Sequence, residues 1–457
     1  MNTAAPELDR DELARARRVR ESLPKGGLFH EKSWRVSPRA FPISGAFAAE
    51  LDQLGYRLWQ FVIACNQLYR LSADGRQPAW IAGLLDRGKP AELVEAARDR
   101  RFRDEIPAVL RPDLVLTEQG FTIAEIDSVP GGIGLTAWLG REYAALGEDI
   151  LGGANGMLEG FASVVPGGDI VVSDEAATYR PEMEWLAARL PGHHRFLNGR
   201  SDADPVWRVL DDAPRDDWQK NVYRFFELFD LANVRCAPQL IARARAGELR
   251  VTPPFKPQLE EKLWFGLFWL RPLEGYWLRE LGEKSLAALR RVIPYTWLVD
   301  PAPLPPHAVL PRLEVQSWDE VAAFSQKQRE LILKVSGFNE NAWGSRGVVV
   351  AQDVPHSEWR EALANALASY DRQPQLLQQF HKGRVVEHPW LDEESGALVT
   401  MRGRVRLCPY FFPGEGRVKC AGALATICPQ DKKLLHGMSE AILVPTSVSP
   451  AGDQSKD

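Results

Sequence analysis

The spacing of hydrophobic residues divides the chain into a helical N-terminal part and a longer part of mixed strands and helices. From Phe47 to about Asp74, apolar residues return every three or four positions, which predicts one long amphipathic helix. Shorter helical patterns continue to about Arg103. We therefore predict a mostly helical region over residues 1–104.

Beyond this region, strand patterns alternate with helical ones. Residues 169–173 form an apolar run typical of a short buried strand, and a helical pattern follows over about 180–190. Such a β–α unit is compatible with a mixed or parallel sheet. Residues 215–290 are predicted to be helical, and the proline-dense segment 299–311 to be a linker or a wall loop. Residues 105–310 are thus expected to form an α/β region that contains a helical insertion.

The last part of the chain has the pattern of an α+β region. Ser317 and Glu320 are spaced as a capping box, which predicts a helix to about Glu330. We expect a mainly antiparallel sheet in residues 311–445 and a disordered tail over 446–457. Strand-like runs occur at 331–335, 348–350, 376–380, 398–410 and 418–427, with a helical pattern at 357–370.

Length and composition limit the kinds of protein that this can be. The 457 residues suffice for two or three domains, and 45% hydrophobic with 26% charged residues is ordinary for a soluble protein. The formal net charge of −5 gives no reason to expect nucleic acid or an anionic membrane as a partner. The N-terminus lacks an apolar signal region, and the longest apolar segment, Leu263–Leu270, is too short to span a bilayer. We therefore expect a cytoplasmic location.

The five cysteines are odd in number and lack CxxC spacing. A disulfide framework needs paired cysteines, and a structural zinc site needs closely spaced ones. The sequence therefore predicts neither of them.

The densest group of charged residues lies in the segment RPDLVLTEQGFTIAEID, which begins at Arg111. Two strand-like runs flank a tight turn there, so we predict a β-hairpin. Side chains on a strand repeat every two residues, which would place Ile123, Glu125 and Asp127 on one face. The turn would bring Asp113 back beside Glu125.

Carboxylates this close together repel one another unless a cation lies among them. Oxygen ligands alone suit Mg²⁺, which typically also binds water and substrate phosphates. The glycine-rich turn Pro130–Gly134 follows at once, and backbone N–H groups in such a turn can approach an anion closely. The alternative is a solvated hairpin that happens to carry charges. The combination favours a nucleotide–metal site with Asp113, Glu125 and Asp127 as ligands.

A second group of candidate residues lies around the segment KVSGFNENAWGSRG. Lys334 would sit at a strand end, where its ammonium suits phosphate oxygens, and Gly337, Gly344 and Gly347 would let the loop fold over a bound group. The alternative is an ordinary mobile hairpin with a surface lysine. The GxxxxGK[ST] order is absent and no GxGxxG follows a strand here, so a Walker or Rossmann site is not expected. Lys262, at the head of an apolar helix, is unremarkable on its own.

Together these segments resemble the circularly permuted ATP-grasp ligases, in particular the synthetase half of glutathionylspermidine synthase, over roughly residues 105–445. In that family an Arg-x-Asp pair precedes a Glu-x-Asn that completes a Mg²⁺ site. Here Arg111-Pro112-Asp113 and Glu125-Ile126-Asp127 keep the spacing, with aspartate in place of asparagine. Aspartate still offers a ligand oxygen, but it adds a negative charge.

Two further segments share this resemblance. Glu261-Lys262 is similar to the family's Asn-Lys at the head of an apolar helix, and Lys334 with its glycine loop is similar to the family's strand lysine and mobile loop. The run Leu376–Phe380 falls where the family places the strand and hinge that hold adenine. The residues that would contact ATP are Lys262, Lys334, Gly337, Gly344, Gly347, Gln378 and Gln379.

The resemblance implies a mixed α+β and α/β fold, a circularly permuted ATP-grasp fold with a helical N-terminal region. It also implies an ATP- and Mg²⁺-dependent ligase that joins a small-molecule carboxylate and an amine through an acyl phosphate. Arg111 would be the catalytic residue that stabilises the transferring phosphoryl group. No cysteine–histidine amidase half is attached, so peptidase activity is not expected.

Two other functions are compatible with the same residues: a nucleotide-binding accessory protein that has lost catalysis, and an ATP-grasp kinase that phosphorylates an alcohol. The sequence specifies neither the substrates nor the oligomeric state. Arg402, Arg404 and Arg406 alternate along one predicted strand. They could bind a carboxylate-rich substrate or ATP phosphates, or form a solvated basic face.

Overall fold

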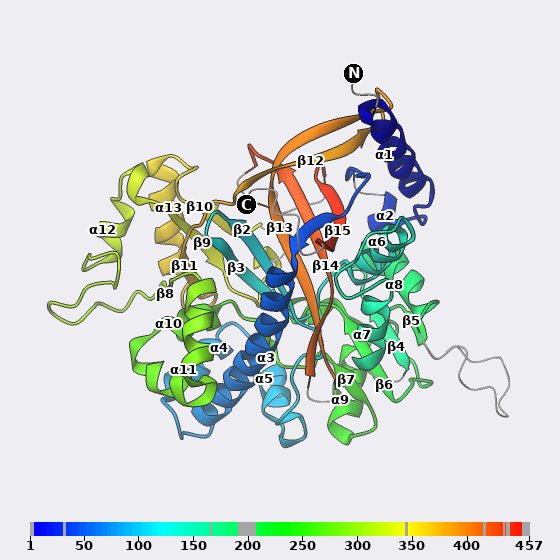
Figure 1. Cartoon of the computed structure of the whole chain (residues 1–457). Helices are drawn as coiled ribbons and strands as arrows, with labels where there is room; N and C mark the ends of the chain where they lie inside the picture. Colours follow the sequence, from blue (N-terminus) through cyan, green and yellow to red (C-terminus); the bar gives the residue numbers. More distant parts are fainter. Residues whose placement is uncertain are drawn as a thin grey trace.

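The computed structural model contains three β-sheets with helices packed around them (Figure 1). It describes residues 4–30, 33–164, 167–190, 207–342, 346–414, 417–432, 435 and 439–449. Gly344 and most of the predicted tail, residues 450–457, lie outside these ranges. The described helices include none with the length and hydrophobicity needed to cross a membrane.

The largest sheet has seven strands in the order β1-β15-β14-β13-β2-β3, with β12 paired to β13. All pairs are antiparallel except β1 with β15. The strands are β1 Phe41–Ser44, β2 Arg111–Thr117, β3 Gly120–Asp127, β12 Val385–Asp392, β13 Ala397–Gly414, β14 Arg417–Pro429 and β15 Ile442–Ser449.

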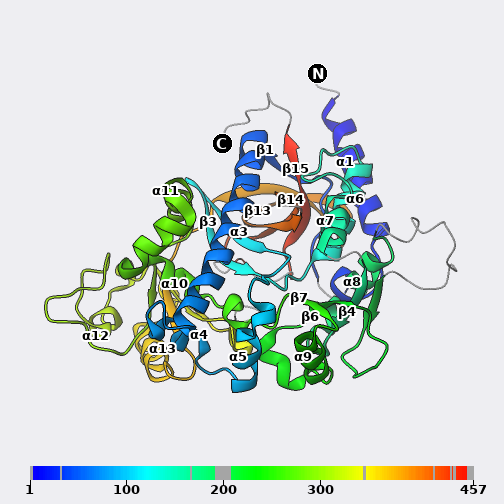
Figure 2. The same cartoon turned by 90° about the horizontal axis from the view of Figure 1, so that it is seen from below.

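Two smaller sheets lie on opposite sides of the large one in Figure 1. Figure 2 shows β4, β6 and β7 of one of them on the side away from α13. One is antiparallel, in the order β10-β9-β11-β8, and the other is parallel, in the order β5-β4-β6-β7. The antiparallel strands are β8 Thr296–Leu298, β9 Leu331–Val335, β10 Val348–Val350 and β11 Gln375–Gln379. The parallel strands are β4 Gly168–Val172, β5 Trp207–Leu210, β6 Asn221–Phe225 and β7 Arg250–Thr252.

The main core lies between the large sheet and the helices α3, α6 and α7, whose apolar faces it buries. The long helix α3, predicted from about Phe47, begins after Ser44, whose side chain accepts from the Phe47 N–H. The helices are α1 Ala4–Glu21, α2 Gly27–His30, α3 Gly45–Ala73, α4 Ala79–Asp86, α5 Ala91–Arg98, α6 Ile133–Ala145, α7 Gly156–Val164, α8 Arg180–Ala187, α9 Ala237–Ala246, α10 Leu263–Trp269, α11 Glu274–Val292, α12 Trp318–Ala322 and α13 His356–Ala368.

Three expectations about the elements are wrong. The segment 215–290 contains the strands β6 and β7 as well as helices, because short buried parallel strands have no alternating pattern that separates them from helix. The helix capped by Ser317 ends at Ala322, because Ser325 starts a second capping box and a 3₁₀ turn. Residues 446–449 continue β15, because they pair in parallel with β1, a partner remote in sequence.

Two helical glycines make opposite predictions about the packing of the N-terminal region. A Cβ on Gly55 in α3 would lie 2.4 Å from the Phe411 ring, whereas Gly83 in α4 has open space around it. We expect Gly55→Ala to lower the free energy of unfolding by about 1–3 kcal/mol through overpacking. Gly83→Ala should raise it by about 0.5–1 kcal/mol through helix propensity. Urea denaturation of both variants checks this, and a stabilised Gly55→Ala would contradict the described packing of α3 on β13.

Candidate functional site

A cavity of about 610 Å³ lies between the large sheet and the antiparallel four-stranded sheet. Ligand pockets in proteins are typically of this size. Its floor is formed by β14, β13, β2 and β3 of the large sheet. The strands β9 and β11 of the antiparallel four-stranded sheet line its other side. The strand register places Arg406 opposite both Thr426 and Val115, and it places Asp113 opposite Glu125. The predicted hairpin and its pairing of Asp113 with Glu125 are therefore confirmed.

A β-bulge at Ala124 decides which hairpin side chains face the cavity. Leu114 pairs with Ile123 while Asp113 pairs with Glu125, so Ala124 is an extra residue on β3. Neighbours on a strand point to opposite faces, and their partners follow them. Ile123 therefore lies in the core, while Glu125 lines the cavity. The expectation that Ile123 shares the face of Glu125 and Asp127 is wrong for this reason.

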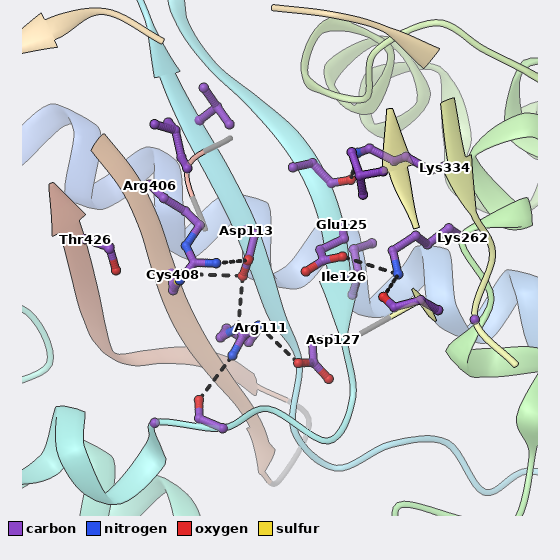
Figure 3. A pocket seen from close by; sticks show the side chains of 18 of the residues that line it. Arg111, Asp113, Glu125, Ile126, Asp127, Lys262, Lys334, Arg406, Cys408 and Thr426 are labelled. Carbon is purple, nitrogen blue, oxygen red and sulfur yellow. Dashed lines mark hydrogen bonds and ion pairs between the residues drawn. The ribbon is translucent and has the colours of Figure 1, made fainter. Parts of the chain in front are cut away.

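The cation among the predicted carboxylates is the chain's own guanidinium (Figure 3). Arg111 Nε lies 2.9 Å from Asp113 Oδ1, and its Nη2 lies 3.0 Å from Asp127 Oδ2. Arg406 Nη1 lies 3.1 Å from Asp113 Oδ2, and Lys262 Nζ lies 3.3 Å from Glu125 Oε2. Across the described parts of the chain, no group of three or more Asp, Glu, His or Cys side chains is arranged to hold a metal ion. The carboxylates thus do not need a metal for charge balance.

Burial and pairing give these groups different proton affinities. Burial would lower the pKa of Arg111, but Asp113 and Asp127 outweigh it and hold that pKa well above its ordinary value. Burial would raise the pKa of Glu125, but Lys262 and Lys334 bring it below its ordinary value. Burial and then the charge of Glu125 raise the pKa of Asp127, against the opposing effect of Arg111. Of Glu125 and Asp127, Glu125 is therefore the one more firmly held in the ionised form.

Lys334 connects β9 of the antiparallel four-stranded sheet to the bulge on β3. Its Nζ donates to the Ala124 carbonyl at 2.9 Å, a group that the bulge leaves out of the ladder, and to Gln378 Oε1 at 2.9 Å. Gln378 in turn donates to Thr296 Oγ1 at 3.0 Å, and Gln379 lines the cavity beside it. Burial lowers the pKa of Lys334 from its ordinary value of 10.5 to about 8. The structure brings Lys334, Gln378 and Gln379 together at this cavity.

Gly337 and Gly347, the described glycines of the segment 336–347, serve close packing. A Cβ on Gly337 would lie 2.1 Å from the Glu260 carbonyl, and one on Gly347 would lie 2.7 Å from the Asn341 carbonyl. Gly347 N also donates to that Asn341 carbonyl at 2.7 Å. Both described glycines line the cavity, but they are fixed to neighbouring backbone. Lys262 contacts the same segment, because its Nζ donates to the Ala342 carbonyl at 3.1 Å.

The glycine-rich turn before α6 already holds an anion, which belongs to the protein. Gly132 N and Leu135 N donate to the two carboxylate oxygens of Glu182 at 2.8 and 2.9 Å. Glu182 is fully buried, and burial raises its pKa to about 7 although these hydrogen bonds oppose the rise. The expectation that this turn receives a ligand's anion is wrong, because α8 supplies a carboxylate there. The turn still matters to the site, since the Gly131 carbonyl accepts from Arg111 Nη1 at 3.1 Å.

The far end of the cavity is acidic and aromatic, and the sequence reasoning missed it. Glu227 follows β6 at the carboxyl end of the parallel sheet, the edge where α/β sheets bind ligands. Burial, and then the charges of Glu260 and Asp127, hold the pKa of Glu227 well above its ordinary value. Tyr179 and Phe229 line the same end.

The three alternating arginines of β13 have separate environments. Arg406 lines the cavity, Arg404 Nε donates to the Gly383 carbonyl at 3.1 Å, and Arg402 forms an exposed pair with Glu387 at 3.6 Å. Only Arg406 of the three is thus placed to meet a ligand. The spacing on one strand face was the sequence signal, but only the sheet order identifies which arginine enters the cavity.

Comparison with known proteins gives structural similarity only. No protein-family model matches the sequence, and no curated protein matches it. The solved apo structure of a glutathione synthetase-like effector from Globodera pallida matches 97% of this chain and 96% of its own, at 10% identity and a TM-score of 0.55. A structure assigned as a gamma-glutamylcysteine synthetase from Methylobacillus flagellatus matches 83% of this chain and 87% of its own, at 11% identity and a TM-score of 0.37.

The first of these similarities shows the fold. The chain has a mixed α/β fold similar to that of the glutathione synthetase-like effector. This agrees with the fold class predicted from the sequence at that level. The second similarity has a TM-score of 0.37, which is too low to carry an argument. The circular permutation stays a prediction.

The buried pairing of Arg111 predicts a large stability difference between two arginine variants. Arg111→Met would leave Asp113 and Asp127 without their shared cation, and breaking a buried pair typically costs about 3–5 kcal/mol. Arg402→Met breaks a pair whose side chains are 63% and 68% exposed, so it should change stability little. Thermal and urea denaturation measure both. Adding Asp127→Asn to Arg111→Met should recover part of the loss, and equal stability of the two single variants would refute the described charge network.

Proposed function

We propose that this protein is an ATP- and Mg²⁺-dependent ligase that joins a small-molecule carboxylate to an amine through an acyl phosphate. One observation carries the proposal: cations from two sheets surround one cavity. Arg111 and Arg406 come from the large sheet. Lys334 comes from the antiparallel four-stranded sheet, and Lys262 lines the same cavity. The glutathione synthetase-like fold supports it.

In this proposal the two lysines bind ATP phosphates and the arginines act on the transferring group. Lys262 and Lys334 both reach the hairpin carrying Glu125, so phosphates bound by them would lie over β3. Arg111 is held by Asp113, Asp127 and the Gly131 carbonyl, which fixes its direction before any ligand binds. A preorganised guanidinium stabilises charge that develops on a phosphoryl group at little reorganisation cost.

Two of the three predicted metal ligands fit Mg²⁺ carried on the phosphates. The side chains of Glu125 and Asp127 are 31% and 21% exposed, whereas that of Asp113 is 3% exposed and receives an arginine on each oxygen. Mg²⁺ at nucleotide sites usually takes one or two carboxylates together with water and phosphates. Glu125 and Asp127 would hold the ion, and Asp113 would anchor Arg111. The ion would supply neutralisation of phosphate charge.

The two substrates would enter from different sides. A carboxylate lying near Arg111 and Arg406 would accept the γ-phosphoryl group of ATP, releasing ADP and giving an acyl phosphate. The end at Glu227 and Tyr179 suits a cationic amine, because its charge would favour the ionised form of Glu227 and would be attracted to the Tyr179 ring. The reacting nitrogen, after releasing a proton to become the free amine, would attack the acyl carbon, lose a second proton and displace phosphate, which leaves an amide. More specifically, we propose that the reaction is similar to that of glutathionylspermidine synthase.

Product analysis tests the reaction class. Full-length protein is supplied with Mg²⁺ and ATP and one of three substrate sets: glutathione with spermidine, γ-glutamylcysteine with glycine, or glycerol as an alcohol. A ligase releases ADP and phosphate with an amide product, whereas a kinase gives a stable phosphoester without free phosphate. Binding of ATP without any turnover would support the accessory protein, and no binding of Mg²⁺–ATP to folded protein would remove the whole proposal.

Variants of the two named roles should fail differently. Arg111→Lys keeps a cation beside Asp113, so ATP should still bind while turnover falls by about 10²-fold or more. Glu125→Gln removes one charge from the metal-holding pair, so Mg²⁺-dependent nucleotide affinity should weaken. Calorimetry and phosphate release separate these outcomes, and full turnover by Arg111→Lys would show that the guanidinium is not catalytic.

The lowered pKa of Lys334 predicts a pH dependence of nucleotide binding. Glu125 and Asp113 favour its charged form, Lys262 and burial disfavour it, and the resulting pKa is about 8. Since phosphates need the ammonium, affinity for a non-hydrolysable ATP analogue should fall as pH rises through 8, by at most about tenfold per unit. Lys334→Arg stays protonated and should abolish this fall. A pH-independent wild-type affinity would contradict the phosphate role of Lys334.

The lowered pKa of Lys334 has the opposite effect on the free energy of unfolding, which it makes larger as pH rises. Between about pH 8 and the ordinary lysine value of 10.5, the unfolded chain binds more protons at this position than the folded chain. The contribution of Lys334 to the free energy of unfolding should therefore rise with pH over that range. Denaturation of wild type and Lys334→Arg at pH 7.5 and 9.5 measures it as a difference, with all other titrating groups held in common.

A further inference from the structure

We propose that the buried ion pair between Lys89 and Glu261 positions the two lysine-bearing segments of the cavity and makes the N-terminal helical region part of the site. This inference rests on the proposed nucleotide-binding function. Lys89 lies in the connection between α4 and α5, far in sequence from any residue of the cavity. Its Nζ contacts Glu261 Oε1, and the two side chains are each 2% exposed. Neither residue lines the cavity, so neither would touch a ligand there.

The second oxygen of Glu261 holds the segment that leaves β9. Glu261 Oε2 accepts from Gly337 N at 2.9 Å and from the Ser336 hydroxyl. Ser336 Oγ in turn accepts from Leu263 N at 3.2 Å, at the first residue of α10. One carboxylate therefore joins the N-terminal region, the head of α10 and the exit of β9.

Both lysines of the proposed phosphate site are adjacent to this junction. Lys262 follows Glu261 directly, and Lys334 precedes Ser336 by two residues on the strand. Gly337 also packs on the Glu260 carbonyl with no space for a side chain. The hydrogen bonds of Glu261 thus hold the two lysine-bearing segments together, in addition to the hydrogen bond from Lys262 Nζ to the Ala342 carbonyl.

Lys89 supplies the charge that this arrangement requires. An ionised carboxylate buried as deeply as that of Glu261 is costly unless a cation compensates it. Burial would raise the pKa of Glu261, but Lys89 and the hydrogen bonds from Ser336 and Gly337 bring it below its ordinary value. Lys89 Nζ also lies 5.5 Å from the centroid of the Phe338 ring, within the range of a cation–π contact. Loss of Lys89 would therefore release both the carboxylate and the segment after β9.

A charge-neutral rescue tests this inference. Lys89→Met leaves Glu261 as a buried, uncompensated charge, whereas Lys89→Met with Glu261→Gln keeps the shape and an acceptor for Gly337 N. We expect Lys89→Met to weaken binding of the Mg²⁺ complex of a non-hydrolysable ATP analogue by about 10- to 100-fold. The double variant should recover most of that affinity. Calorimetry on full-length protein, well below each melting temperature, gives the dissociation constants.

A matched control separates positioning from general destabilisation. Arg208→Met breaks a pair with the fully buried Asp169 on the parallel sheet, and neither residue lines the cavity. It should lower the melting temperature while leaving nucleotide affinity within about twofold of wild type. If Lys89→Met behaves in the same way, losing stability but not affinity, the positioning role is refuted.

A second measurement does not depend on nucleotide. In the apo protein, Lys89→Met should speed hydrogen exchange at Gly337 and at the turn Glu340–Ala342, and Glu261→Gln in the same chain should slow it again. Arg208→Met should leave these amides unchanged. Unaltered exchange in Lys89→Met overturns the inference even if nucleotide binds. If wild type binds no nucleotide but exchange responds as expected, the junction is established and the proposed function fails instead.

Discussion

Three consecutive residues, Glu260 to Lys262, connect the three sheets through two ion pairs and the hydrogen bonds of one buried carboxylate. Glu260 pairs with Arg224 of β6 in the parallel sheet, and Lys262 pairs with Glu125 of β3 in the large sheet. Between them, Glu261 accepts hydrogen bonds from Ser336 and Gly337, in the segment that follows β9 of the antiparallel four-stranded sheet. Charges removed from water are stable only when compensated, so each pair requires the correct placement of its sheet. The three connections therefore meet at one point of the chain, where Glu260 and Lys262 line the cavity.

Charge compensation also explains why the carboxylates of the site can lie so close together. Arg111 and Arg406 share Asp113, and Arg111 also reaches Asp127. The site is thus assembled before a ligand arrives, and a phosphate-bearing ligand would enter a cavity whose cations are already oriented. Preorganisation of this kind lowers the reorganisation needed when charge moves between ligand groups.

Local features of the site could be predicted from the sequence, and remote ones could not. The hairpin of β2 and β3 follows from two strand-like runs around a tight turn, so the pairing of Asp113 with Glu125 was accessible. Lys334 was recognisable from its place at a strand end. Arg406 meets Asp113 across 293 positions of sequence, which only the strand order of the large sheet determines. Glu182 reaches the turn at Gly132 across 50 positions for the same kind of reason.

The bulge at Ala124 makes the length of β3 as important as its composition. Because strand side chains alternate with a period of two, the extra residue is what allows Ile123 to lie in the core while Glu125 faces the cavity. A chain that lost Ala124 would keep every charged residue of the site. Without the extra residue, however, Ile123 could not lie in the core while Glu125 and Asp127 remain opposite their partners on β2. Homologous chains should therefore tolerate exchanges of single side chains along this strand more readily than a change of one residue in its length.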